Sequence, residues 1–205
     1  MERFFAQVRQ SLVQGGVVAA VIWRALRLGL ENRYHIGCVE PGLWRCMMFR
    51  EMLRKKQALS QEECVAILKR ELRGVLSVLG DDGYPYGMPI NHYYNEQDGK
   101  LYFHSGTRGH KVDAIRRCDK ASFCVYDEGY RKEGEWALNI KSVVVFGRIE
   151  FVEDRATVYR IAEELSRKFT DDDAYIVHEI ESAGPRTLMF ALAPEHITGK
   201  LVNEA

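Results

Sequence analysis

The residues with the clearest chemical pattern lie between positions 101 and 115, which read LYFHSGTRGHKVDAI. The apolar run that ends at His104 and Ser105 predicts a strand, the glycine-bracketed GTRG predicts a loop, and His110 with Lys111 opens a predicted helix. Free N–H groups at a helix start, the positive end of its dipole, a serine hydroxyl and a lysine ammonium together favour one dianionic phosphate. The two glycines let the backbone approach such a ligand closely.

The same segment also has an ordinary structural interpretation. A glycine-rich turn joins a strand to a helix in many folds, and a histidine and a lysine at a helix start can simply be solvated. His104 alternates with Phe103 in the predicted strand and could be a core histidine. The segment matches neither GxxxxGK[ST] nor GxGxxG, so the common nucleotide motifs are absent. Taken alone, these residues leave phosphate binding and a plain turn equally open.

Composition narrows the class of protein. A chain of 205 residues with 46% apolar and 28% charged residues predicts one globular domain plus an appendage. The 29 basic and 29 acidic side chains cancel, which argues against a nucleic-acid partner. Five cysteines without a CxxC pair and six histidines without HxH or HExxH spacing predict no disulfide framework and no metal site. We therefore expect a reducing, cytoplasmic location.

The first part of the chain reads differently from the rest. Residues 16 to 30 (GVVAAVIWRALRLGL) are apolar, but Arg24 and Arg27 interrupt the run short of the ~20 residues that a membrane span needs. No clean A-x-A cleavage site follows. We expect residues 1–47 to be an N-terminal extension with a linker, either a peripheral amphipathic helix or a non-native upstream piece. The folded domain is expected over residues 48–205, without an integral membrane span.

Several short elements must position the segment. Ser60 and Glu63 form a capping-box pattern that predicts a helix over 61 to 72. Strands are predicted at 73 to 80, 84 to 95, 100 to 105, 121 to 126, 142 to 152 and 187 to 193, with a further stretch at 196 to 202. Helices are predicted at 111 to 117 and 154 to 168.

Turn and breaker residues refine this outline. Asp82 and Gly83 predict a tight hairpin turn, and Gly147 predicts a bulge or bend. Pro85 and Pro89 place parts of the second strand either at an edge or facing a ligand. Antiparallel strands with short turns, and helices that are inserted and do not alternate with them, favour a barrel over a doubly wound parallel sheet. The fold class is therefore mainly β, a β-barrel with flanking helices.

From residue 48 onward the sequence resembles the pyridoxamine 5'-phosphate oxidase-like FMN-binding split barrels, and within them the nitroimidazole-resistance (Nim) branch. The resemblance rests on the order and spacing of FREMLRKK, GVLSVLGDDGYPYGMPINHYY, LYFHSGTRGHKVDAIRR, KASFCVY, SVVVFGRIEF and ITGK. It implies a six-stranded antiparallel split β-barrel that binds flavin mononucleotide (FMN) at the interface of a homodimer.

The resemblance also implies a set of cofactor-binding positions. The positions that match the binding site of the FMN phosphate and ribityl chain are His104, Ser105, His110 and Lys111. The positions that match the stretch along the isoalloxazine ring are Pro89, Ile90, Asn91 and His92. Ser142 matches a polar contact from the facing strand or the other subunit. No catalytic side chain is implied. An arginine expected in the second strand is replaced by PIN, and the arginine-bearing C-terminal segment is not recognisable, which argues against pyridoxamine phosphate oxidation.

The function implied is an FMN-dependent oxidoreductase that reduces a small electrophile, such as a nitroaromatic, with electrons from NAD(P)H or another donor. A flavin chemistry of this kind requires no protein nucleophile. The chief alternative is a protein of the same fold that binds or senses flavin or haem without turnover. A structural dimer whose loop binds nothing is the third hypothesis.

Overall fold

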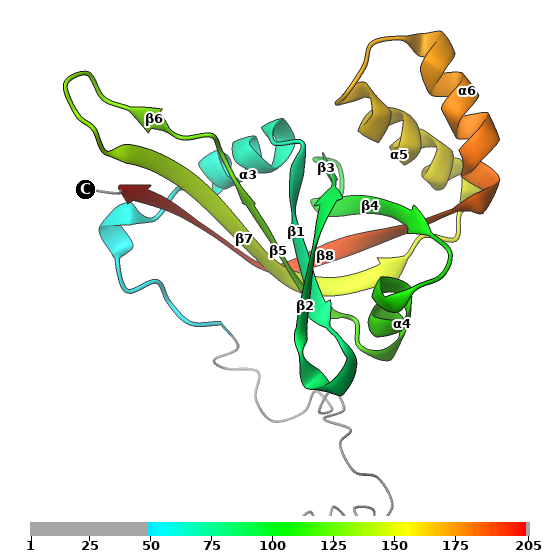
Figure 1. Cartoon of the computed structure of the whole chain (residues 1–205), viewed down its shortest axis with the longest axis horizontal. Helices are drawn as coiled ribbons and strands as arrows, with labels where there is room; N and C mark the ends of the chain where they lie inside the picture. Colours follow the sequence, from blue (N-terminus) through cyan, green and yellow to red (C-terminus); the bar gives the residue numbers. More distant parts are fainter. Residues whose placement is uncertain (1–48, 204–205) are drawn as a thin grey trace, which may run out of the picture. The chain divides into compact units, whose positions relative to one another are not determined.

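The computed structural model describes residues 49–203, and its centre is one antiparallel sheet (Figure 1). The predictions for residues 1–47 lie outside the described residues. The strands, in chain order, are β1 (Arg73–Leu79), β2 (Pro85–Asn91), β3 (Tyr93–Asn95), β4 (Lys100–Gly106), β5 (Lys120–Tyr126), β6 (Tyr130–Arg131), β7 (Leu138–Phe151) and β8 (Thr187–Asn203). The helices are α3 (Gln61–Arg70), α4 (His110–Arg117), α5 (Arg155–Arg167) and α6 (Asp173–Ala183), with short 3₁₀ turns η1 (Lys55–Gln57), η2 (Asp81–Gly83) and η3 (Gly184–Arg186).

The sheet is curled, and the connection between its two edge strands explains why. Neighbouring strands follow the order β2-β1-β5-β7-β8-β4-β3, and β6 pairs with β7. The two outermost strands, β2 and β3, are separated in the chain only by His92, so the two edges of the sheet must come together. This geometry confirms a mainly β, split-barrel fold with flanking helices. The short strands β3 and β6 are additional to the six predicted, because the predicted return strand divides at His92 and β7 extends to carry a small hairpin with β6.

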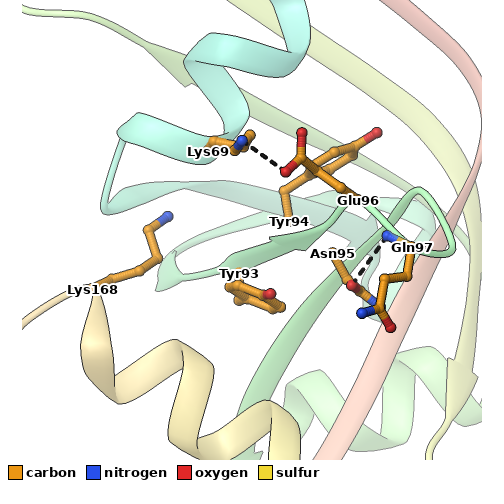
Figure 2. A pocket seen from close by; sticks show the side chains of 7 residues that line it. All are labelled: Lys69, Tyr93, Tyr94, Asn95, Glu96, Gln97 and Lys168. Carbon is orange, nitrogen blue, oxygen red and sulfur yellow. Dashed lines mark hydrogen bonds and ion pairs between the residues drawn. The ribbon is translucent and has the colours of Figure 1, made fainter.

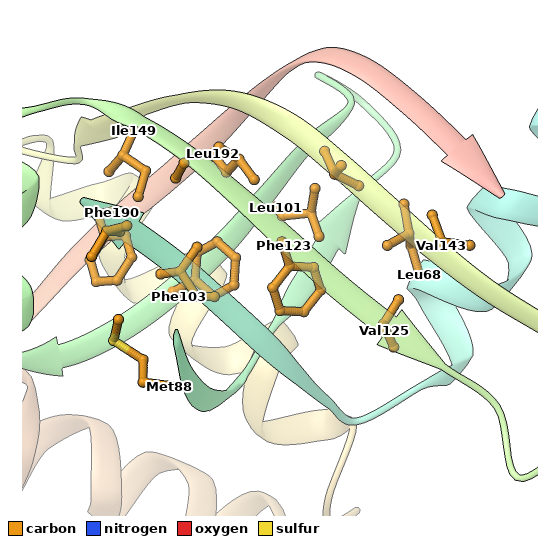
Figure 3. Close-up of a cluster of buried hydrophobic side chains, with 14 of the residues drawn as sticks. Leu68, Met88, Leu101, Phe103, Phe123, Val125, Val143, Ile149, Phe190 and Leu192 are labelled. Atoms are coloured by element: carbon orange, nitrogen blue, oxygen red, sulfur yellow. The ribbon is translucent and has the colours of Figure 1, made fainter. Parts of the chain in front are cut away.

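Alternating side chains fill the inside of the curled sheet (Figure 3). Phe103 of β4 lies with its ring centroid 5.3 Å from that of Phe123 of β5 and 5.4 Å from that of Phe190 of β8. Two helices contribute to the same core, α3 through Leu68 and α4 through Ile115. The core therefore holds α3 and α4 against the sheet, and α4 lies against β1.

The turn and breaker residues act as the sequence predicts. Asp82 and Gly83 both adopt positive φ, 55° and 78°, which matches a tight hairpin turn between β1 and β2. The β7–β8 register shifts between Phe146 and Gly147, and a Cβ at Gly147 would collide with the backbone of Ala193. Pro85 begins β2, which is an edge strand as predicted.

The helices begin at polar caps. Ser60 and Glu63 form the predicted capping box, with hydrogen bonds of 3.0 Å and 3.2 Å. Helix α3 ends at Arg70, two residues before the predicted end, because Glu71 is already extended and leads into β1. Asp154 and Asp172 cap α5 and α6, which follow β7 and precede β8 in the chain and lie beside each other at one side of the sheet (Figure 1). Within residues 49–203 no helix has the length and apolar character needed to cross a membrane.

Candidate functional site

The candidate site is the turn from β4 into α4. His104 and Ser105 lie in the last part of β4, and His104 is exposed while Ser105 is half-buried. Gly109 precedes α4 with φ 120° and ψ 170°, a conformation that favours glycine, and no side chain caps the helix start. A Cβ on Gly106 or Gly109 would meet no atom within 4 Å. The backbone here is open to a ligand, and the first N–H groups of α4 have no capping side chain.

Two basic side chains lie next to this turn. Lys111 is half-buried, and withdrawal from water lowers its pKa. Among residues 49–203 no carboxylate pairs with its ammonium and no hydrogen bond is formed by it. The pKa of His104 is also lowered, first by desolvation and then by the positive charge of Lys111. An anion between them would supply the missing counter-charge.

His110 is held in place by the β1–β2 hairpin. Its ring stacks on Tyr86 at a centroid distance of 4.2 Å and an interplanar angle of 12°. The backbone N–H of Asp81 donates to His110 Nε2 at 3.4 Å, and the Asp81 carboxylate lies 3.5 Å from the same nitrogen and 3.0 Å from Arg117. The start of α4 is therefore tied to the start of β2. We refer to the turn from His104 to Lys111 as the cradle.

The predicted ring-binding stretch extends from that point along β2. Pro89 is exposed, and Ile90 and Asn91 are half-buried. Asn91 Oδ1 accepts a hydrogen bond of 2.9 Å from Arg73 Nε. Three residues of extended chain span ~10 Å, so Pro89 lies about that far along the strand from Tyr86. An elongated ligand with its anionic end in the cradle could follow this edge strand.

The structure places His92 elsewhere. Its side chain is fully buried, and Nε2 donates a 2.8 Å hydrogen bond to the Leu68 carbonyl of α3. The ring centroid lies 4.7 Å from that of Phe123, while Nδ1 has no hydrogen-bond partner in the described part of the chain. Burial, followed by the positive charge of Lys168, lowers the pKa of His92 to about 3. Within one chain His92 faces the core and does not join the cradle.

Ser142 is also separated from the cradle within one chain. It lies in β7 between Tyr126 of β5 and Lys200 of β8. His104 pairs with Met189 of the same β8, and Met189 and Lys200 are eleven positions apart in the sequence. At roughly 3.3 Å per residue this amounts to some tens of ångströms along the strand.

Sequence reasoning did not identify an apolar patch on the outer face of the sheet. The strand register aligns Val75 of β1, Cys124 of β5 and Val144 of β7, and the neighbouring row ends in Phe146. Val75 and Phe146 are 36% and 37% exposed, and Cys124 and Val144 are half-buried. The sequence signal for this patch was that residues of β1, β5 and β7 alternate between the two faces of the sheet. Every second residue must therefore face away from the core, and several of these are apolar. Ser142 lies on this same outer face, two residues from Val144.

Two cavities lie away from the cradle. One, of about 220 Å³, borders α3, β3 and the end of α5 (Figure 2). The other, of about 700 Å³, lies along α5 and α6 and includes Tyr159, Ile176 and Val177. Neither is lined by a predicted site residue. The cradle itself is an exposed turn on the surface of one chain, because His104 and residues 106–110 are all exposed.

The family model for pyridoxamine 5'-phosphate oxidase matches residues 60–201. No curated protein matches.

Among solved structures, the chain is similar to a Bacteroides thetaiotaomicron protein named for resistance to 5-nitroimidazole antibiotics, with a TM-score of 0.59 and 19% identity over 71% of this chain and 87% of that one. It is similar to the FAD and haem binding protein of Mycobacterium smegmatis, with a TM-score of 0.57 and 21% identity over 72% and 73%. An FAD-binding protein of Mesorhizobium loti matches with a TM-score of 0.52 and 24% identity over 71% and 97%. These likenesses show the fold, and the match over residues 60–201 shows that the chain belongs to the pyridoxamine 5'-phosphate oxidase family.

Proposed function

We propose that the chain binds FMN, with the phosphate in the cradle, and that it acts as an oxidoreductase on a small electrophile. The observation that carries this proposal is the half-buried ammonium of Lys111, which has no partner among residues 49–203 and lies beside the uncapped start of α4. A half-buried cation without a counter-ion is costly, and a dianionic phosphate would relieve that cost. FAD is the related alternative, because two similar proteins are named for it.

Different residues of the chain would bind the phosphate and the ring of the flavin. Lys111 and the first N–H groups of α4 would neutralise the phosphate, and the Ser105 hydroxyl would donate to it. His104, whose pKa is lowered, would be neutral near pH 7 and would add a neutral donor. His110, oriented by Asp81 and Tyr86, would face the same ligand. Pro89, Ile90 and Asn91 would lie along the flavin ring; His92, also predicted there, faces the core in this structure, so its proposed role is to fix the end of β2.

A homodimer is part of the proposal. The outer face of the sheet exposes Val75 and Phe146 around half-buried Cys124 and Val144, and a second copy of the same face could bury this patch. Ser142 lies on that face and is far from its own chain's cradle, so it could reach a flavin only from the partner subunit. The open cradle of one chain would then become an enclosed site.

When bound, FMN would supply hydride and electron transfer, while the protein sets its orientation and access. A nitroaromatic is the proposed electrophile, with NAD(P)H as the proposed donor, and the likeness to a protein named for 5-nitroimidazole resistance supports this choice. The second candidate is flavin or haem binding without turnover, supported by the likeness to an FAD and haem binding protein. Either role is proposed for the cytoplasm. Reduction of bound flavin by NAD(P)H, followed by reoxidation with metronidazole, separates the two.

The decisive variant is Lys111→Met, with Lys100→Met as the matched control. Lys100 also lies on β4 but pairs with Glu150 and is distant from α4. A hydrogen bond to a charged group contributes roughly 1.5–3 kcal/mol, so Lys111→Met should weaken FMN binding about tenfold to a hundredfold. The measurement is quenching of free FMN fluorescence on titration with protein. Equal affinities for Lys111→Met and the wild type would refute the proposed cradle.

A further inference from the structure

The 220 Å³ cavity has a polar lining from three separate elements (Figure 2). Helix α3 contributes its last turn, β3 and the following residues form one wall, and the end of α5 forms another. The lining residues are Lys69, Tyr93, Tyr94, Asn95, Glu96, Gln97 and Lys168. Such a concave site with a few convergent polar groups is typical of small-molecule binding.

Lys168 is the cation of this cavity that forms no ion pair with a carboxylate of residues 49–203. Its ammonium donates to the carbonyl of Glu71 at 2.6 Å and to the carbonyl of His92 at 3.0 Å. An ammonium has three N–H donors, so one remains. The nearby carboxylate of Glu71 pairs instead with Arg70 at 2.8 Å. Desolvation lowers the pKa of Lys168 to about 8, which leaves the group mostly charged near pH 7.

The charged side chains that line the cavity are Lys69, Glu96 and Lys168, and together they carry one net positive charge. Lys69 and Glu96 neutralise each other through an ion pair of 2.8 Å, so the net positive charge of the lining is that of Lys168. Neutral donors are also present. The Asn95 amide nitrogen has no partner among residues 49–203, and burial raises the pKa of the Tyr93 phenol, which keeps its proton. A monoanion would balance the charge and use these donors.

This cavity is separate from the cradle. Asn95 pairs with Lys100 at the start of β4, whereas the cradle begins at the other end of that strand with His104 and Ser105. A strand of this length spans about 20 Å. The two sites therefore occupy different parts of the surface, and ligand binding in the cavity does not depend on the proposed flavin.

We propose that the cavity binds a small organic monocarboxylate. Its carboxylate accepts a hydrogen bond from Lys168 Nζ, and its body lies between Tyr93 and the Lys69–Glu96 pair, the groups drawn around the cavity in Figure 2. The bound anion joins α5 to β3 and α3, and it completes the coordination of an ammonium that already links Glu71 and His92.

The test is isothermal titration calorimetry of the full-length protein, with and without FMN. The probes are benzoate and acetate, and the uncharged controls are benzamide and acetamide. At least one carboxylate should bind at millimolar concentration or below, and at least tenfold more tightly than its amide. Failure of both carboxylates to saturate the protein, or equal binding of acid and amide, would overturn the proposal.

Two variants sharpen the test. Lys168→Gln should weaken carboxylate binding at least tenfold, but it also removes a link between α3 and α5 and could perturb folding. Glu96→Gln removes the single carboxylate of the lining, so it should strengthen binding several-fold, a gain that misfolding cannot imitate. Unchanged or weaker binding to Glu96→Gln would contradict the proposal.

A third variant separates the two sites. Lys111→Met should lose FMN affinity and bind the carboxylate as the wild type does. Loss of carboxylate binding in Lys111→Met would place the anion in the cradle instead of the cavity.

Discussion

Protonation of one buried histidine should control the acid stability of the protein. His92 is fully buried, Nε2 donates to the Leu68 carbonyl, and Nδ1 is the nitrogen left to accept a proton. Protonation would place a charge in the core close to the Lys168 ammonium, without a hydrogen-bond acceptor for the new N–H. The folded state therefore resists protonation, and the pKa of His92 falls from 6.5 to about 3.

The sign and size of the effect follow from linkage. Between pH 6.5 and pH 3 the unfolded chain binds a proton at this position and the folded chain does not, so stability is lost as the pH falls through this window. One pKa unit corresponds to about 1.4 kcal/mol. At a pH roughly two units below the unfolded pKa, His92 should cost about 3 kcal/mol of the free energy of unfolding.

Urea unfolding followed by circular dichroism provides the assay, at several pH values from neutral down to about two units below the unfolded pKa of histidine. The variant His92→Gln lacks the titrating group, so its stability should fall less on acidification, by about 3 kcal/mol relative to the wild type. His178→Gln, which replaces an exposed histidine of α6, is the matched control and should follow the wild type. Parallel pH dependences for the wild type and His92→Gln would refute the reasoning.

The remaining predictions concern the cradle and the outer face. Gly109→Ala must hold φ near 120°, so the free energy of unfolding should fall by about 1–3 kcal/mol in urea unfolding; an unchanged value would contradict the strained conformation. Asp81→Asn removes a negative charge beside the cradle but keeps the backbone N–H that holds His110, so FMN affinity measured by fluorescence should rise several-fold, whereas a fall would mean that the carboxylate itself positions His110. Phe146→Glu places a charge in the outer apolar patch, so light scattering should report a monomer for this variant and the proposed dimer for the wild type; a wild type that is itself monomeric would contradict the proposed interface.

Short-range sequence patterns predicted much of the fold. The capping box at Ser60 and Glu63 and the turn at Asp82 and Gly83 depend on residues within three positions of each other, so a sequence pattern could identify them. The bulge at Gly147 was predictable because glycine in a strand interior is unusual. The segment from 101 to 115 was also predictable from local signals, because its strand, loop and helix follow one another directly in the sequence.

Contacts between distant residues were not accessible from the sequence. His92 directly follows an edge strand, and only the position of Leu68 on α3 shows that its side chain enters the core. The cavity depends on Lys168 meeting the carbonyls of Glu71 and His92, which are far away in the sequence. The separation of Ser142 from its own chain's cradle likewise depends on the register of β7 and β8. No local pattern encodes such pairings.

Flavin binding is the central claim, and one measurement tests it most directly. The absorbance spectrum of freshly purified full-length protein should show the two visible bands of oxidised flavin, and mass spectrometry of the released cofactor should give the mass of FMN. Protein isolated without flavin should acquire the same spectrum when FMN is added. A colourless protein that does not bind added FMN would contradict the cradle at β4 and α4 and the redox function built on it.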